Sequence, residues 1–403
     1  MGAFGPVPRM NASRPGSASE VFATFLRLGL TSFGGPVAHI GYFRREVVER
    51  RAWMGEARFG ELVGLCQFLP GPASSQLGFS VGLLRAGWPG ALAAFAGFTL
   101  PSALLLFAFA MLLPDVPREA AATLTHGLKL VAVAVVAHGL VGMARQLCPD
   151  AVRALIAAAG AAATLAIGAP WIQLAVVAAG AIAGIALCAK APRIAAAPPR
   201  LPHGRAAGIA LVAAYLGLLV ALPVAAAALG GPLALASGFY RAGALVFGGG
   251  HVVLPLLQHT VVEPGWISRD DFLAGYGAAQ AIPGPMFTLA AYLGARIGGL
   301  AGSALATASI FLPGLLLVAG ALPLWQSVAR HPRAASAVAG INAAVVGLLA
   351  AALYDPVWTS AVASPADAAI AAAGFLLLAW LRAPPLAAVA WCVAAAFAAS
   401  ALR

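Results

Sequence analysis

The side chains best suited to bind an anion are Ser74, Ser75 and Gln76, which directly follow the segment Leu69-Pro70-Gly71-Pro72. Its prolines end one helix and fit the first turn of the next, so the three polar residues are expected at a new helix N-terminus. Free backbone N–H groups and hydroxyls at such an end attract anions. We therefore predict that these residues bind an anionic substrate.

A second copy of this turn, Ile282-Pro283-Gly284-Pro285, is followed by Met286-Phe287-Thr288, and a glutamine precedes each copy, at Gln67 and Gln280. Two glycine-rich breaks, at Phe33-Gly34-Gly35-Pro36 and Phe247-Gly248-Gly249-Gly250, complete a set of four. An isolated Gly/Pro pair is more simply a kink that permits close helix packing. Four paired breaks favour a function instead, because they free backbone groups for a substrate. The positions assigned to substrate are Ser74, Ser75, Gln76, Gln67, Gln280, Thr288, Lys129, Gly34, Gly35, Gly248 and Gly249, and those assigned to the breaks are Pro36, Pro70, Gly71, Pro72, Pro283, Gly284 and Pro285.

Five further charged or titratable residues and Lys129 are candidates for charge balance. Lys129 lies well inside an apolar run, where a lysine is costly unless it binds substrate, snorkels or has a partner. Arg85 and Arg296 each follow a broken segment and are either gate cations or lipid-interface anchors. His39, His251 and Glu61 are candidates for proton coupling, although a lone histidine at a break is more often structural.

The elements that must position these residues are membrane-spanning helices. Of 403 residues, 62% are hydrophobic and 9% charged, so a water-soluble surface could not be maintained. Apolar stretches of about 20 residues recur, each long enough to span ~30 Å of hydrocarbon as a helix. The expected fold is an all-α polytopic membrane protein that contacts lipid and contains broken or re-entrant helices.

An internal repeat organises the chain. The Phe-Gly-Gly and Pro-Gly-Pro motifs recur about 213 positions later, Trp53 corresponds to Trp266, and the ordered matches extend to Gly127 and Gly340. This series indicates duplication. The expected parts are a flexible tail (1–19), a first repeat (20–189), a basic cytoplasmic linker (190–206), an extra helix (207–230) and a second repeat (231–403). The extra helix gives the second repeat the opposite orientation.

Two topologies remain open. If residues 21–40 and 59–88 each cross the membrane, the arginine-rich stretch 42–58 lies outside and the chain crosses thirteen times. If each segment dips in and returns, that stretch lies inside and nine crossings remain. The positive-inside rule favours the re-entrant topology.

Other classes of protein fit less well. The net charge of +11 comes from basic residues in short loops, which argues against nucleic-acid binding. No nucleophile, general base or metal cluster has the spacing of a membrane enzyme, and nothing indicates a cofactor. The sequence leaves a homodimer open as an oligomeric state.

Long motifs resemble the chromate transporter (chromate ion transporter) family in its two-domain form: Ser32 to Phe43, Cys66 to Gln76, Arg85-Ala86-Gly87 and Phe98-Thr99-Leu100-Pro101. The resemblance implies homologous halves of opposite topology, usually described with thirteen spans. It also implies chromate export across the bacterial inner (plasma) membrane, conferring resistance. Alternating access is the expected mechanism. A transporter of sulfate or another tetrahedral oxyanion, and a passive anion channel, are the alternatives.

Overall fold

The computed structural model describes residues 16–32, 35–167, 172–188, 201–246, 253–325 and 332–401, and every regular element in these ranges is helical. The first half contains α1 (Ala18–Thr31), α2 (Gly35–Arg44) with η1 (Arg45–Arg50), α3 (Glu56–Phe68), α4 (Ala73–Leu112), η2 (Leu113–Asp115), α5 (Arg118–Leu147), α6 (Ala151–Ile167) and α7 (Ile172–Leu187). Helix α8 (Arg205–Leu229) follows. The second half contains α9 (Gly231–Leu245), α10 (Val253–Val261), α11 (Arg269–Ala281), η4 (Met286–Thr288), α12 (Leu289–Ala321), α14 (Pro332–Ala352), η5 (Leu353–Trp358), α15 (Thr359–Ala361), α16 (Pro365–Ala379) and α17 (Pro385–Ala401).

The two halves have the same order of elements, which confirms the predicted repeat. In each, two short helices separated by a break are followed by a 13-residue helix, a Pro-Gly-Pro turn and a long kinked helix. The kinks also match, at Ala86 and Gly87 in α4 and at Gly298 and Gly299 in α12. Helix α8 stands alone between the halves, as expected for the extra span. The first helix begins at Ala18, just before the predicted end of the tail.

Helices α1 and α2 form a re-entrant hairpin. Glu20, in the first turn of α1, accepts a hydrogen bond from Trp53 Nε1 at 3.3 Å and lies 3.7 Å from Arg51. Both partners follow η1, so the chain returns to the end at which it entered. Helix α1 has 14 residues, a length of about 21 Å, which is too short to span the hydrocarbon core alone.

Helix α3 and the first part of α4 form a second re-entrant hairpin. Arg85, at the end of that part, pairs with Glu20 at 3.2 Å, which brings the chain back to the same end. Gly87 then adopts a positive φ of 66°, and the rest of α4 folds back along the first part. A Cβ at Gly82 would meet the Gly90 carbonyl oxygen and Ala94, so the two parts are in close contact.

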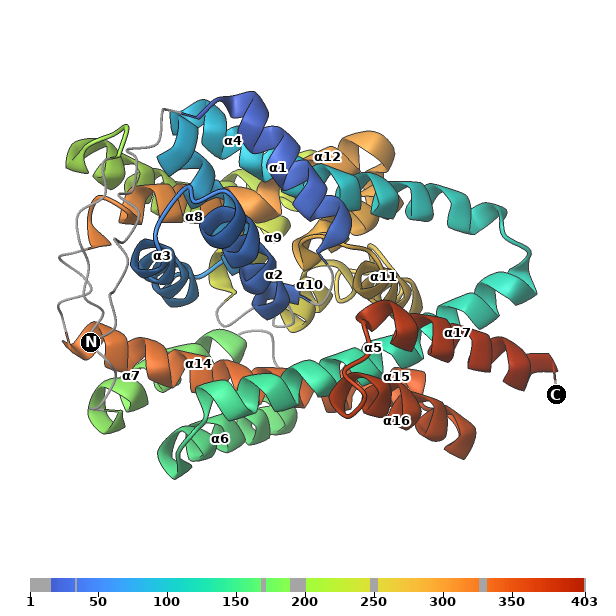
Figure 1. The fold of residues 1–403 in the computed structure, drawn as a ribbon. Coiled ribbons are helices and arrows are strands. Elements are labelled where there is room, and N and C mark those ends of the chain that lie inside the picture. Colours follow the sequence, from blue (N-terminus) through green and yellow to red (C-terminus); the bar gives the residue numbers. More distant parts are fainter. Residues whose placement is uncertain are drawn as a thin grey trace, which may run out of the picture.

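These hairpins agree with the re-entrant topology, and the number of crossings stays a prediction. Five helical segments in the described ranges are long and apolar enough to span a membrane, and four shorter apolar helices accompany them. In Figure 1 the second part of α4 and α5 run in opposite directions across the molecule and are joined at its right-hand edge. The protein is a multi-pass membrane protein with broken helices, as the sequence predicts.

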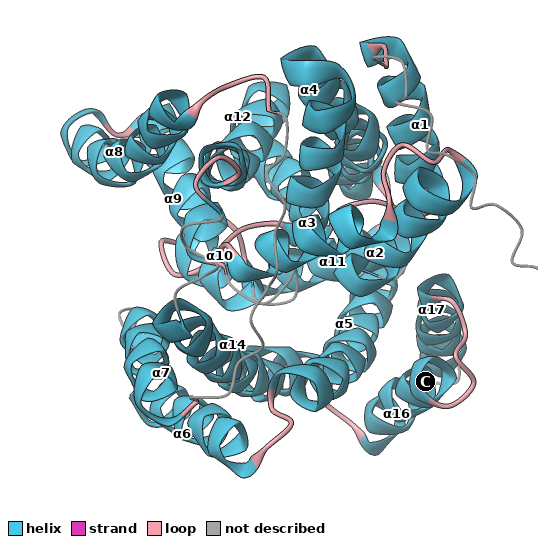
Figure 2. Cartoon of the chain, turned by 60° about the vertical axis from the view of Figure 1, so that its left-hand side comes forward, coloured by secondary structure: helices cyan, strands magenta, loops and turns pink. Residues whose placement is uncertain are grey.

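The helices form two layers (Figure 2). One contains α1 to α4 and α8 to α12, and the other contains α5 to α7 and α14 to α17. Within the second layer the halves exchange partners, because α6 and α7 pack on α14 whereas α16 and α17 pack on α5. Glycines permit these contacts: a Cβ at Gly184 would meet the Ser336 carbonyl oxygen, and one at Gly127 would meet Val393. The two repeats therefore fold as one interlocked unit.

The close packing within α4 predicts that Gly82→Ala destabilises the protein. The new methyl group would overlap backbone of the same hairpin, an overpacking effect of about 1–3 kcal/mol. Gly142→Ala is the control, because a Cβ there meets nothing within 4 Å. Thermal unfolding in detergent should show a lower Tm for Gly82→Ala alone. Equal Tm values would contradict the packing described.

The hairpins also predict which loops face the cytoplasm. Gly55→Cys, after the arginine-rich stretch, should react with an impermeant thiol reagent only after the cells are opened. Pro264→Cys, at the corresponding place in the second half, should react in intact cells. Labelling is compared with the wild-type background. The reverse pattern is what thirteen crossings would give.

Candidate functional site

The four helix breaks meet through backbone hydrogen bonds between the two halves. The N–H of Gly71 donates to the carbonyl of Val246 at 2.7 Å, and the N–H of Gly284 donates to the carbonyl of Ser32 at 2.9 Å. Gly71 and Gly284 are repeat-related, as are Ser32 and Val246. Each Pro-Gly-Pro turn thus binds the end of the first short helix in the opposite half. We call this arrangement the central junction.

Both turns require glycine. Gly71 has φ of 119° and Gly284 has φ of 111°, values that L side chains rarely adopt. Space is also short, because a Cβ at Gly71 would lie 3.1 Å from Gly314 Cα, and one at Gly284 would lie 2.7 Å from Ser102 Oγ. The prolines on either side end the helices, as predicted. Gly35 and Pro36 begin α2, whereas Gly34, Gly248, Gly249 and His251 lie outside the described residues.

Gln76 makes hydrogen bonds within the central junction. Its side-chain nitrogen donates to the carbonyls of Pro70 at 2.8 Å and Gly314 at 3.1 Å. Both amide hydrogens are therefore used to hold the first turn against α12, and the amide oxygen that remains cannot donate to an anion. Gln76 therefore holds the central junction in this structure, and its contact with substrate stays a prediction.

Three buried hydroxyl groups of the first half have no hydrogen-bond partner in the described chain. Among the described residues, the side-chain oxygens of Ser32, Ser75 and Thr99 are buried and make no hydrogen bond. Ser74, the residue before Ser75, is also buried. Buried polar groups are rarely left unpaired, because desolvation is costly, so these hydroxyls are available to a ligand. Sequence reasoning did not assign Ser32 or Thr99 to substrate, although both lie within recognised motifs.

The corresponding polar groups of the second half bind internally. Thr288 Oγ1 donates to the carbonyl of Pro285 at 2.6 Å. Gln280 is buried, contacts the Met286 sulfur at 3.4 Å and hydrogen-bonds Tyr276. Gln67, its first-half counterpart, is exposed at the end of α3. The available donors therefore belong mainly to the first half.

Lys129 is directed away from the central junction. Its ammonium pairs with Asp270 at 2.8 Å, in the first turn of α11, whereas the junction lies beyond the last turn of that helix. The pair lines a cavity of about 380 Å³ that also contains Arg296, Asp271 and His126. Lys129 and the serines are not brought together in this structure.

The other predicted cations and Glu61 form ion pairs. Arg85 pairs with Glu20 and lies over the Trp53 ring at 5.2 Å, and Arg296 pairs with Asp271 at 3.3 Å. Glu61 pairs with Arg58 at 2.9 Å. These contacts fix the outer ends of the re-entrant hairpins.

His39 is buried beside the Ser32 backbone, with its ring edge-on to Phe98 at 5.3 Å. It therefore lies against the first break, as its position in the sequence predicts. Its part in proton coupling stays a prediction.

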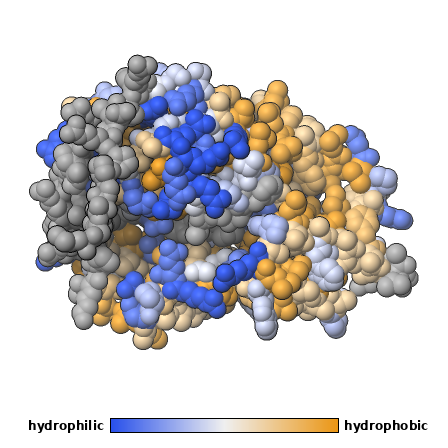
Figure 3. Space-filling model, in the orientation of Figure 1, coloured by the Kyte–Doolittle hydropathy of each residue, from blue (hydrophilic) through white to orange (hydrophobic). Residues whose placement is uncertain are grey.

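The arginine-rich stretch forms a polar surface in front of the first re-entrant hairpin (Figure 3). Glu46 in η1 is its buried centre and binds Arg50 and Arg51 at 2.9 and 2.7 Å. Burial alone would raise the pKa of this carboxyl, but the Arg51 hydrogen bond and the charges of Arg50, Arg51 and Arg27 hold its pKa below the usual value. Glu46 is thus a fixed negative charge at neutral pH.

Helix α11 and its repeat counterpart α3 are buried to different extents. Helix α11 is buried against α5, where a Cβ at Gly277 would overlap the Leu128 carbonyl. Its counterpart α3 leaves Gly60 and Gln67 exposed, whereas the equivalent Leu273 and Gln280 are buried. The scaffold is symmetric in element order but asymmetric in this contact.

Comparisons with known proteins agree with the motifs. A family model described as chromate transporter matches residues 19–185 and 233–399. A chromate transport protein of Pseudomonas aeruginosa is 31% identical over 301 residues, 74% of this chain and 71% of that protein. A probable chromate transport protein of Synechococcus elongatus is 29% identical over 324 residues, 79% of each chain. No solved structure matches.

The contacts of Gln76 predict that Gln76→Glu destabilises the protein by about 1–3 kcal/mol, because carboxylate oxygens would face two carbonyl oxygens without a donor. Gln67→Glu makes the same change at an exposed position and should alter stability by less than about 0.5 kcal/mol. Thermal unfolding of both variants in detergent measures the difference. A stable Gln76→Glu variant would remove the positioning role.

Proposed function

The chain belongs to the chromate transporter family, and from this we propose that it carries chromate across the membrane, exports it by alternating access and confers chromate resistance. The observation that carries the proposal is the central junction, where buried hydroxyls without partners lie at helix breaks. Broken helices at the contact between inverted repeats are where secondary transporters bind their substrates.

The chemistry of the junction suits a tetrahedral dianion. Ser32, Ser75 and Thr99 supply hydroxyl donors. Helix α4 begins at Ala73 without a side-chain cap, so N–H groups of its first turn remain free to donate to a ligand. Several converging donors are needed to compensate chromate for the water it loses.

The asymmetric closure supports alternating access. The α5–α11 contact closes one face, and the exposed α3 leaves the equivalent face open on the side of the arginine-rich stretch. By the positive-inside rule this is the cytoplasmic side. Export then begins from this state, with the arginines raising the local concentration of anions.

Lys129 contributes in the state that is open to the outside. When α11 leaves α5, the Lys129–Asp270 pair separates, and the ammonium becomes available to the anion. While the outer face is closed, the Asp270 carboxylate therefore neutralises Lys129 in place of the transported anion. This exchange gives the intramembrane lysine a partner in both states.

Chromate uptake into inside-out vesicles tests the proposal. Ser75→Ala should lower kcat/KM by roughly tenfold or more, the value of a hydrogen bond to a charged group. Ser80→Ala is the matched control on the same helix, because the Ser80 hydroxyl already donates to the Gln76 carbonyl. Normal transport by a correctly inserted Ser75→Ala variant would reject this site.

The same vesicles separate the alternatives. Accumulation driven by a pH gradient, with chromate preferred over sulfate, supports a coupled chromate exporter. Accumulation of sulfate without preference for chromate identifies a general oxyanion carrier, and equilibration alone identifies a channel. Lys129→Met should abolish transport whereas Asp270→Asn should retain it. Equal losses would make the ion pair purely structural.

A further inference from the structure

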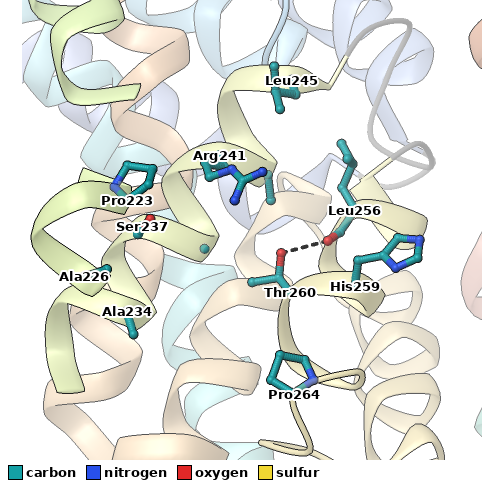
Figure 4. A pocket seen from close by; sticks show the side chains of 12 residues that line it. Pro223, Ala226, Ala234, Ser237, Arg241, Leu245, Leu256, His259, Thr260 and Pro264 are labelled. Atoms are coloured by element: carbon teal, nitrogen blue, oxygen red, sulfur yellow. Dashed lines mark hydrogen bonds between the residues drawn. The ribbon is translucent and has the colours of Figure 1, made fainter. Parts of the chain in front are cut away.

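A cavity lined mainly by apolar side chains lies between α8, α9 and α10, and its lining extends to Leu245, next to the Val246 of the central junction. Its volume is about 400 Å³, and it is lined by Ser237 and Arg241 of α9 and Thr260 of α10, with Pro223 and Ala226 of α8 on the opposite wall. Figure 4 shows the Arg241 side chain extending from α9 into the space in front of Thr260. Ser237 and Arg241 are four residues apart on one helix, so they share a face.

The internal repeat pairs Arg241 with Arg27. The segment Phe25-Leu26-Arg27-Leu28-Gly29 corresponds to Phe239-Tyr240-Arg241-Ala242-Gly243. Both arginines lie on the short helix before a break, and both are exposed in the part of the chain that the structure describes. The correspondence of Arg27 and Arg241 is visible only when the two halves are aligned.

The two arginines differ in their counter-ions. Arg27 lies in the field of Glu46, the buried carboxylate of η1. Thr260 occupies the position equivalent to Glu46 in the second half, so the carboxylate is replaced by a hydroxyl. Among the described residues, neither Arg241 nor Arg27 makes an ion pair, but Arg27 lies near the Glu46 carboxylate, which itself binds Arg50 and Arg51. The second half therefore keeps the cation without a carboxylate at the position of Glu46.

The remaining groups around the cavity leave this charge unbalanced. His259 pairs with Glu263, and in Figure 4 its ring points away from Arg241. The Thr260 hydroxyl donates to the Leu256 carbonyl at 2.8 Å. Ser237 is buried and lines the cavity. A cation in a small cavity with a neighbouring hydroxyl suits an anion that accepts several hydrogen bonds.

We propose that this cavity is a second oxyanion site, in which Arg241 supplies the charge and Ser237 a hydroxyl donor. Its ligand is a tetrahedral oxyanion group, either a free ion of the sulfate type or the phosphate of a lipid. The first half differs at this place, because Glu46 puts a carboxylate near Arg27.

The test reads the cavity directly and measures no transport, so its failure would leave the proposed function intact. Ala226→Cys is introduced on the facing wall, and its reaction with an anionic methanethiosulfonate is followed by mass spectrometry of that peptide. In lipid-free detergent, sulfate should slow the reaction of the otherwise wild-type chain. Arg241→Gln should raise the sulfate concentration for half-protection by about tenfold or more, as expected when a charged hydrogen-bond donor is lost.

Two further variants control for folding and for general charge effects. Thr260→Glu restores the carboxylate of the first half, and it should abolish protection while leaving Arg241 in place. Arg27→Gln removes the symmetry-related arginine and should leave protection unchanged. Each variant is first shown to elute as the wild type does in size-exclusion chromatography.

The source of the oxyanion group is decided by a parallel arm. Mixed micelles containing phosphatidylglycerol are compared with micelles containing an uncharged glycolipid. Protection by sulfate identifies a site for free oxyanions, and protection by phosphatidylglycerol alone identifies a lipid phosphate. The proposal is overturned if neither protects Ala226→Cys, or if protection is as strong with Arg241→Gln or Thr260→Glu.

Discussion

The structure depends on satisfying backbone groups that are freed where helices break in an apolar interior. Each Pro-Gly-Pro turn ends a helix, and its central N–H must find a carbonyl. The partner lies in the other half, since Gly71 binds Val246 and Gly284 binds Ser32. The reciprocal bonds hold the two repeats together at the point where both are interrupted. Neither turn could keep its conformation with a side chain at its glycine.

Duplication has preserved this backbone while the side chains diverged. The first half retains hydroxyls at Ser75 and Thr99 that have no partner within the described chain, whereas Thr288 of the second half is internally bonded. A symmetric scaffold therefore carries an asymmetric set of donors.

The charged residues act mainly at the ends of the hairpins. Glu20 contacts Arg85, Arg51 and Trp53, and these contacts hold the ends of both first-half hairpins on the same side. In the second half, Asp271 binds Arg296 and Asp270 reaches Lys129 of α5. The first set connects residues within one half, whereas Lys129–Asp270 connects the two layers. That pair must separate if the layers are to move.

The sequence by itself determined the helical membrane fold, the repeat and the positions of the breaks. These follow from properties of the residues themselves: apolar length, the fixed φ and missing N–H of proline, and the conformational freedom of Gly71 and Gly284. The charge pattern also favoured the re-entrant topology, because basic loops indicate the cytoplasmic side.

Only the tertiary structure decided which residues meet. Gln76 donates to Gly314, and Lys129 pairs with Asp270, although both partners are distant in sequence. The packing of α6 and α7 on α14 of the other half is likewise absent from any local pattern. A side-chain donor such as the Gln76 amide could donate to any of many carbonyl groups. Its residue type therefore does not identify which carbonyl it contacts. That choice depends on how the two repeats close around the breaks, which gave Gln76 a partner in α12 and left the Ser75 hydroxyl without one in the described chain.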